Sequence, residues 1–186
     1  MSIADQLEQT TNGAATMIAA LRPDELALPT PNEGWDVRTM LNHMIVVNKN
    51  FTYMVTGEGT RPAAEADHVG SDPAGSYRAS VATVLAAWRR PGALEGTVTM
   101  AAGETPAHLA CGANFVDALQ HTWDLARATG RPYPLDPALS ETGLEISRIR
   151  VTPDRRGPGK AYGPEVACAA DAPPQDRLAA FLGRQP

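Results

Sequence analysis

The chain has little of what several protein classes require. Its 186 residues include only two cysteines, Cys111 and Cys168, and no Cys-x-x-Cys pair, which excludes a disulfide scaffold. With 16 Lys and Arg against 21 Asp and Glu, the net charge is −5, and this argues against a nucleic-acid partner. No apolar run approaches the ~18–20 residues that span a bilayer, and no secretory signal is recognisable. We therefore expect a cytoplasmic protein with no membrane partner.

Hydrophobic periodicity predicts a mainly α-helical protein with one short β-ribbon. The expected helices cover residues 2–21, 36–56, 76–90, 106–129 and 137–148, with a final turn or two over 175–182, and the ribbon covers residues 94–105. We divide the chain into a helical bundle, 1–150, and a loop-rich C-terminal extension, 151–186, expected to pack on the same domain. The connection over residues 57–73 is long, so we expect it to be mobile or to cover a site.

One predicted helix, over residues 106–129, carries a polar stripe. Its members recur at spacings of 3, 4 and 3 residues and so share one side of the helix: Asn114, Asp117, His121 and Asp124. Asp117 and His121, one turn apart, have the geometry of two metal ligands. The alternative is a solvated polar face, or a side-chain pair that only stabilises the helix.

His43, in the predicted helix 36–56, offers a third ligand. Taken alone, a histidine that flanks an apolar face is more often a core or boundary residue bonded to a carbonyl. Together with Asp117 and His121 it would make a three-ligand set, which leaves positions open for water or substrate. The other histidines have weaker claims: we expect His68 to be exposed, and His108 only shares a His-x-x-Cys spacing with Cys111.

A small basic cluster follows in the extension. Arg155, Arg156 and Lys160 stand close together in a Pro- and Gly-rich stretch. We interpret the cluster as solvated, with contact to an anionic ligand as the alternative.

Two segments resemble a known family. Residues 31–43, Pro-Asn-Glu-Gly-Trp-Asp-Val-Arg-Thr-Met-Leu-Asn-His, resemble the G-W-x-V-R-x-(L/M)-x-x-H opening of the mycothiol-dependent maleylpyruvate isomerase family. Residues 117–130, Asp-Ala-Leu-Gln-His-Thr-Trp-Asp-Leu-Ala-Arg-Ala-Thr-Gly, resemble its E-x-x-x-H-x-W-D-L-A-x-A-T-G segment. The likeness covers residues 1–130 in layout and implies a DinB-like, metal-binding four-helix bundle of the DinB/YfiT-like superfamily.

The resemblance implies a metal triad of His43, Asp117 and His121. Zn²⁺ is the first choice of ion and Ni²⁺ the second, and Asp124 would orient the His121 imidazole rather than bind metal. The chain departs from the family at Asp117, where glutamate is usual. Aspartate is one methylene shorter, which places the ion closer to the helix or weakens its occupancy.

The implied activity is a metal-dependent thiol S-transferase or isomerase. Its partners would be a low-molecular-weight thiol such as mycothiol and a small electrophile, with the thiolate as nucleophile. Residues 57–73 and the basic part of the extension would be candidate parts of the substrate cleft. Two alternatives stay open: a non-catalytic metal- and small-molecule-binding protein, and a bundle with a structural or vestigial metal site that forms a homodimer through its helix faces.

Overall fold

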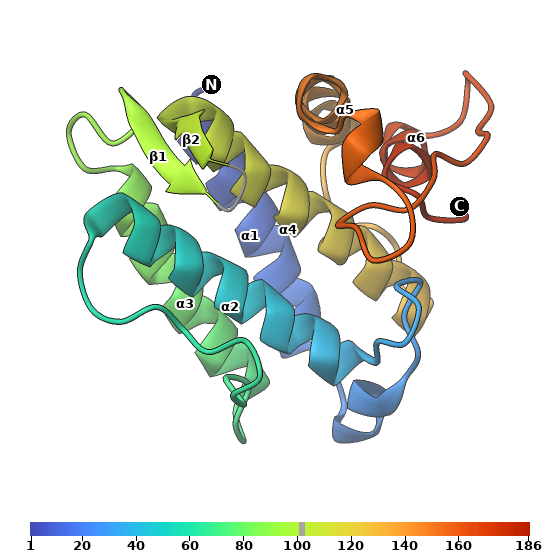
Figure 1. Ribbon diagram of the computed structural model, residues 1–186. Coiled ribbons are helices and arrows are strands. Elements are labelled where there is room, and N and C mark those ends of the chain that lie inside the picture. Colours follow the sequence, from blue (N-terminus) through green and yellow to red (C-terminus); the bar gives the residue numbers. More distant parts are fainter. Residues whose placement is uncertain (101–102) are drawn as a thin grey trace.

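The computed structural model describes residues 1–100 and 103–186. Its elements, shown in Figure 1, are α1 (Ile3–Ala19), η1 (Pro23–Ala27), α2 (Val37–Thr56), α3 (Pro73–Trp88), β1 (Thr97–Met100), β2 (Gly103–Pro106), α4 (Ala107–Thr129), α5 (Pro137–Arg150), η2 (Pro153–Arg155) and α6 (Pro174–Phe181). The predicted class, a mainly helical DinB-like bundle with a short ribbon and a loop-rich tail, is confirmed. Among the described residues, no helix is long and apolar enough to cross a bilayer.

Local capping decides where the helices begin and end. The Ser2 hydroxyl accepts from the Asp5 amide while the Asp5 carboxylate accepts from the Ser2 amide, a capping box that starts α1. Asp36 caps α2 by accepting from the Thr39 amide at 2.7 Å. Gly130 closes α4 in the left-handed conformation, with φ 64°, so this helix ends at Thr129, the predicted last residue.

The first four α-helices share one core. α1 contacts α3 and α4, and α2 contacts the same two helices, so the four close into a bundle (Figure 1). α5 and α6 lie on the opposite side of α4. Because α4 is covered from both sides, it is buried along most of its length and around most of its circumference. Its close approach to α5 depends on Gly143, where a Cβ would lie 2.6 Å from Leu119 Cδ1.

One helix start was misplaced, and two short helices were not predicted. α3 begins at Pro73 rather than at Ser76, because Asp72 accepts from the Gly75 amide at 2.8 Å and proline is favourable in the first turn of a helix. The two helices that were not predicted are η1 and η2, each of five residues or fewer. The ribbon is confirmed, with Thr97 opposite Pro106, but residues 101–102 of the predicted stretch lie outside the described residues.

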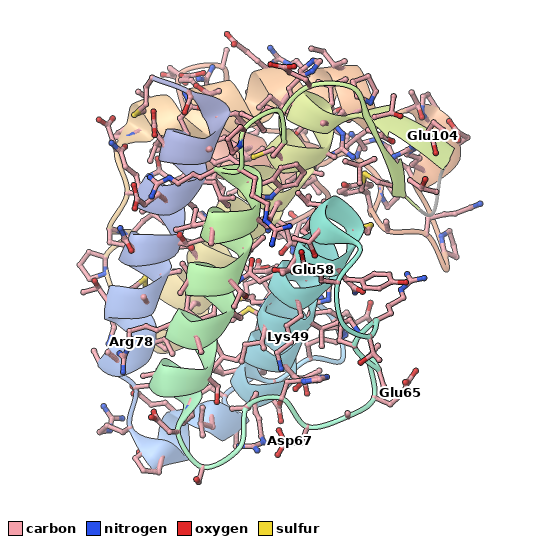
Figure 2. All side chains as sticks on the ribbon, turned by 90° about the vertical axis from the view of Figure 1, so that its left-hand side faces the viewer. Lys49, Glu58, Glu65, Asp67, Arg78 and Glu104 are labelled. Carbon is pink, nitrogen blue, oxygen red and sulfur yellow. The ribbon has the colours of Figure 1, made fainter. Side chains whose placement is uncertain are left out.

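The connection between α2 and α3 lies against the outer side of α2 (Figure 2). Arg38 of α2 forms a salt bridge of 2.8 Å with Asp67, and Lys49 Nζ lies 2.9 Å from His68 Nδ1. His68 is thereby half-buried, so the expectation that it is simply exposed was wrong.

The C-terminal segment is bound to the bundle by polar contacts. Trp123 of α4 donates through Nε1 to Asp176 of α6 at 2.7 Å. Within the segment itself, the Arg156 guanidinium donates to the carbonyls of Phe181 and Gly163, at 2.7 and 3.2 Å, and lies over the Phe181 ring. The division of the chain at residues 150 and 151 stays a prediction.

Candidate metal centre

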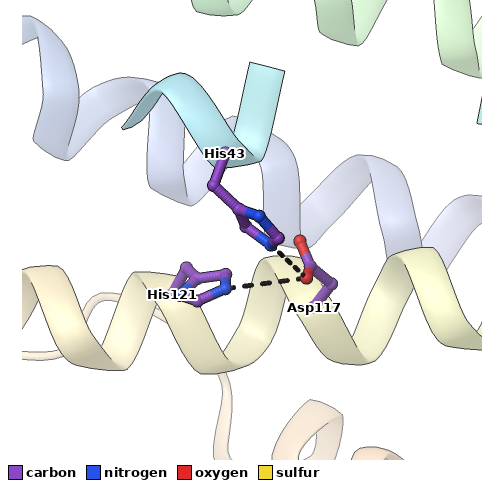
Figure 3. Close-up of side chains that lie close together, drawn as sticks. All are labelled: His43, Asp117 and His121. Atoms are coloured by element: carbon purple, nitrogen blue, oxygen red, sulfur yellow. Dashed lines mark hydrogen bonds and ion pairs between the residues drawn. The ribbon is translucent and has the colours of Figure 1, made fainter. Parts of the chain in front are cut away.

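Three side chains from neighbouring helices converge on one point. His43 extends from α2, and Asp117 and His121 extend from successive turns of α4 (Figure 3). Asp117 Oδ1 lies 3.1 Å from His43 Nε2 and 3.6 Å from His121 Nε2. One potential ligand atom from each residue lies within 4.8 Å of the other two. The spacing on α4 therefore directs Asp117 and His121 toward α2, where His43 meets them.

The far side of the His121 ring is held by Asp124. His121 Nδ1 lies 3.0 Å from Asp124 Oδ2, and the Asp124 carboxylate is fully buried. Gln120 Nε2 donates to Asp124 Oδ1 at 3.1 Å, and Arg184 donates to both carboxylate oxygens at 3.2 Å. When Nδ1 of His121 donates to Asp124, the lone pair for a metal is on Nε2, the nitrogen that faces Asp117.

The charges of the triad are strongly coupled. Burial alone would raise the pKa of Asp117, but the neighbouring His121 and His43 outweigh it and hold that pKa well below its ordinary value. Burial alone would lower the pKa of His121, yet Asp117 and Asp124 raise it to about 9. A cation bound here would displace the His121 proton, as is usual for imidazole ligands.

The donor set fits a divalent transition metal. Two imidazole nitrogens and one carboxylate oxygen are ligand types of zinc sites, and three protein ligands are the number found in catalytic ones. The buried His121 ring also has the carboxylate partner that metal-ligating histidines usually have. The same contacts are compatible with a hydrogen-bonded His–Asp–His cluster, so the ligand role is a proposal.

The triad opens onto a cavity of about 1210 Å³. Trp35 forms part of its wall, with its ring centroid 4.9 Å from that of His43 and 6.1 Å from that of His121. Apolar side chains of α2 extend this wall, among them Val47 and Phe51. Another wall comes from the end of α5 and the C-terminal segment, and its charged residues are mainly basic, with Arg150, Arg155, Lys160 and Arg184 and one acid, Asp154.

Comparison with known proteins identifies the chain's relatives. Residues 7–126 match the family described as the mycothiol maleylpyruvate isomerase N-terminal domain, and this stretch contains all three triad residues. The chain belongs to this family. It is 33% identical over 177 residues to the uncharacterized proteins MT0763 and Rv0738 of Mycobacterium tuberculosis strains CDC 1551 and H37Rv, which covers 95% of this chain and 94% of each relative.

The crystal structure of the mycothiol-dependent maleylpyruvate isomerase is similar to this family member. The TM-score is 0.60 at 17% identity, over 88% of this chain and 75% of that one, and a mutant of the same enzyme gives equal values. At this identity the likeness establishes the shared fold alone.

The structure brings the strongest site candidates together and places the weaker ones away from them. His43, Asp117 and His121 meet, and Asp124 contacts His121. The solvated-face interpretation of the α4 stripe is wrong, because Asn114, His121 and Asp124 are all buried.

The remaining candidates lie apart from the triad. His108 is exposed while Cys111 is buried. Among the described residues that line the cavity, none comes from 57–73, whereas the basic part of the tail does contribute.

Two residues near the centre were not predicted to act there. Trp35 lies in the first family-like motif, and that motif was the signal that could have found it. Arg184 had no such signal, because nothing in the local sequence indicates that it reaches Asp124.

Proposed function

We propose that this family member is a divalent-metal-dependent enzyme that uses a low-molecular-weight thiol of the mycothiol type on a small electrophile, as an isomerase or an S-transferase. The observation that carries the proposal is that a three-ligand cluster opens onto a cavity large enough for two small molecules. A buried structural site would have four protein ligands and no such opening.

His43, Asp117 and His121 would hold the ion, with Zn²⁺ as the first choice and Ni²⁺ as the second. When bound, such an ion lowers the pKa of a thiol or water and polarises a carbonyl. The chain's own contribution is to orient the imidazoles, through the Asp124 contact to His121, and to exclude water with the Trp35 wall beside them.

The basic wall indicates an anionic partner for the cavity. Arg150 is partly buried beside Arg155, and its pKa is lowered mainly by burial. Burying a cation without a counter-charge is unfavourable, so a carboxylate on the substrate would stabilise this side of the cavity. This agrees with the solved relative, whose named substrate, maleylpyruvate, is an acid.

The first test is metal binding by protein purified without a histidine tag. We expect close to one equivalent of Zn²⁺ or Ni²⁺ per chain in wild type and a large loss in His121→Ala. His108→Ala is the matched control, because His108 is an exposed histidine of the same helix, and it should bind metal like wild type. Wild-type protein that neither retains metal nor gains thermal stability from added ions would overturn the metal site.

The second test separates an enzyme from a binding protein. Metal-loaded protein is incubated with mycothiol and either maleylpyruvate or 1-chloro-2,4-dinitrobenzene, and thiol and product are followed together. An isomerase returns the thiol, whereas a transferase consumes one thiol per product. Metal-dependent turnover of either kind supports the proposal, and metal binding without turnover favours the non-catalytic alternative.

A further inference from the structure

Arg184, the third residue from the C-terminus, reaches back to the metal centre. Its side chain is only 12% exposed and lies beside Asp124, whose side chain is 0% exposed. Nε and Nη2 each lie 3.2 Å from a different oxygen of that carboxylate, which makes a two-pronged ion pair. One of those oxygens also accepts from His121 Nδ1 at 3.0 Å. A continuous path of polar contacts thus runs from the tail through Asp124 to a proposed ligand.

The end of α6 is built to hold Arg184 in this place. The Gly183 amide donates to the Ala180 carbonyl at 3.0 Å, and the Arg184 amide donates to the Ala179 carbonyl at 2.9 Å. Together with the positive φ of Gly183, 96°, these bonds form a Schellman motif. Leu182, the C-cap residue of α6, is buried at 2% exposure and anchors this turn in the protein core. The backbone at Arg184 is therefore fixed on both sides of the turn.

We propose that Arg184 is a positioning residue for the metal centre: its guanidinium locks the Asp124 carboxylate, which in turn fixes the His121 ring with Nε2 toward Asp117. This inference rests on the metal site of the proposed function and extends it to the C-terminal segment. It means that the site is complete only when residues 174–184 are docked on α4. Arg184 contacts no ligand atom itself.

Charge and geometry predict opposite effects of removing Arg184. A cation near the site repels a metal ion, so on charge alone Arg184→Met would tighten metal binding. If Arg184 acts by fixing Asp124, the same change loosens His121 and weakens binding. Outer partners of metal ligands usually contribute about 10- to 100-fold in affinity. The direction of the change therefore distinguishes positioning from simple electrostatics.

The experiment measures Zn²⁺ affinity on metal-stripped full-length protein by competition with a chromophoric chelator, together with the visible spectrum of the Co²⁺ form. We expect Arg184→Met to weaken Zn²⁺ binding by about 10- to 100-fold and to alter the Co²⁺ spectrum. Arg184→Lys keeps the positive charge but cannot make the two-pronged contact to Asp124. It should therefore also weaken Zn²⁺ binding, but less than Arg184→Met does. Arg177→Met is the matched control, because Arg177 lies in α6, in the same docked segment as Arg184, but pairs with Glu141 of α5.

A double-mutant cycle tests the route through Asp124. In an Asp124→Asn background, Arg184→Met should cause little further loss of Zn²⁺ affinity. An equal loss in that background, or unchanged or tighter binding by Arg184→Met, would overturn the inference while leaving the metal site intact. A matching loss in Arg177→Met would also overturn it, since the effect would then be general loosening of the tail. Wild-type protein that binds neither Zn²⁺ nor Co²⁺ would overturn the metal site and this inference with it.

Discussion

The C-terminal segment crosses itself at two glycines, and only one of them should tolerate a side chain. Gly183 has φ 96°, and a Cβ on it would lie 2.8 Å from Gly163 Cα and 3.0 Å from the Gly163 carbonyl carbon and amide nitrogen. Gly163 has no positive φ, and its Cβ would meet Gly183 at 3.4 Å or more, an ordinary contact distance. We therefore predict that Gly183→Ala is damaging and that Gly163→Ala is mild, although the two glycines share one contact.

The magnitude follows from two separate costs at Gly183. A left-handed conformation costs a non-glycine residue about 1–2 kcal/mol. Overpacking of this kind adds about 1–3 kcal/mol, because the overlapping atoms are backbone and cannot swing aside. The sum is about 2–5 kcal/mol, which in a domain of this size lowers Tm by about 4–20 °C. If the tail detaches instead, the loss of stability is smaller, but Arg184 leaves Asp124 and metal affinity falls.

The two variants are compared with wild type by thermal unfolding, followed by circular dichroism, and by Zn²⁺ affinity measured on the same samples. We expect Gly183→Ala to fall below wild type in Tm, in affinity, or in both, and Gly163→Ala to remain close to wild type. If the two variants were indistinguishable in both measurements, the crossing would not constrain the tail and this reasoning would be refuted.

Three further predictions concern metal linkage, thiol reactivity and helix packing. Free Zn²⁺ at 100 times its Kd should stabilise the protein by about 2.7 kcal/mol, or about 5–11 °C in Tm, and this shift should vanish in His121→Ala. Burial raises the pKa of Cys111 to about 12, so this thiol stays protonated at pH 8, whereas Cys168 is exposed. Ellman's reagent should therefore modify one thiol per folded chain and two after denaturation, and two fast thiols in the folded protein would contradict this. Gly143→Ala should lower stability by about 1–3 kcal/mol in a denaturant titration, and more than Gly112→Ala, whose Cβ would meet only the flexible Ile146 side chain at 3.3 Å.

Local signals explain which parts of the fold could be predicted from the sequence. The start of α2 was placed well because Asp36 is a strong N-cap, and the end of α4 was placed well because Gly130 is a strong stop signal. Within each of these two helices the apolar residues also recur at regular helical spacing. The start of α3 was misplaced because Pro73 reads equally as a loop residue and as the first residue of a helix. Whether the polar stripe of α4 faces the protein interior or the solvent could not be decided from the sequence. The spacing shows that its residues share one face of the helix but not what covers that face.

Contacts between distant segments explain the rest. His43 lies 74 residues before Asp117, so residue types alone offered the pair only as one alternative, and the family resemblance favoured it. Arg184 lies 60 residues beyond Asp124, and its place depends on the turn at Gly183 and on the crossing with Gly163. No local pattern encodes that path, so the contribution of the tail to the site could not be predicted.

The polar stripe of α4 shows how a helix covered on most sides can carry ionisable groups. Asn114, at one end, donates to Asn48 Oδ1 of α2 at 3.1 Å and accepts from Trp88 Nε1 of α3 at 3.4 Å. Asp124, at the other end, is paired with Arg184 of the tail. Because every one of these buried groups has a partner, the cost of removing it from water is offset, and each partner comes from a different segment.

One middle member of the stripe, Asp117, differs from the two ends because part of its side chain remains exposed. Asn114 and Asp124 are fully enclosed and satisfied within the protein, so they have no capacity left for a ligand. Asp117 keeps 24% of its side chain exposed and His43, facing it, keeps 34%, both toward the cavity. Because enclosed polar residues fix the orientation of α4 on both sides of Asp117, this partly exposed carboxylate can be held in a constant place opposite His43. This is the arrangement that a site needs if it is to bind an ion and still admit a substrate.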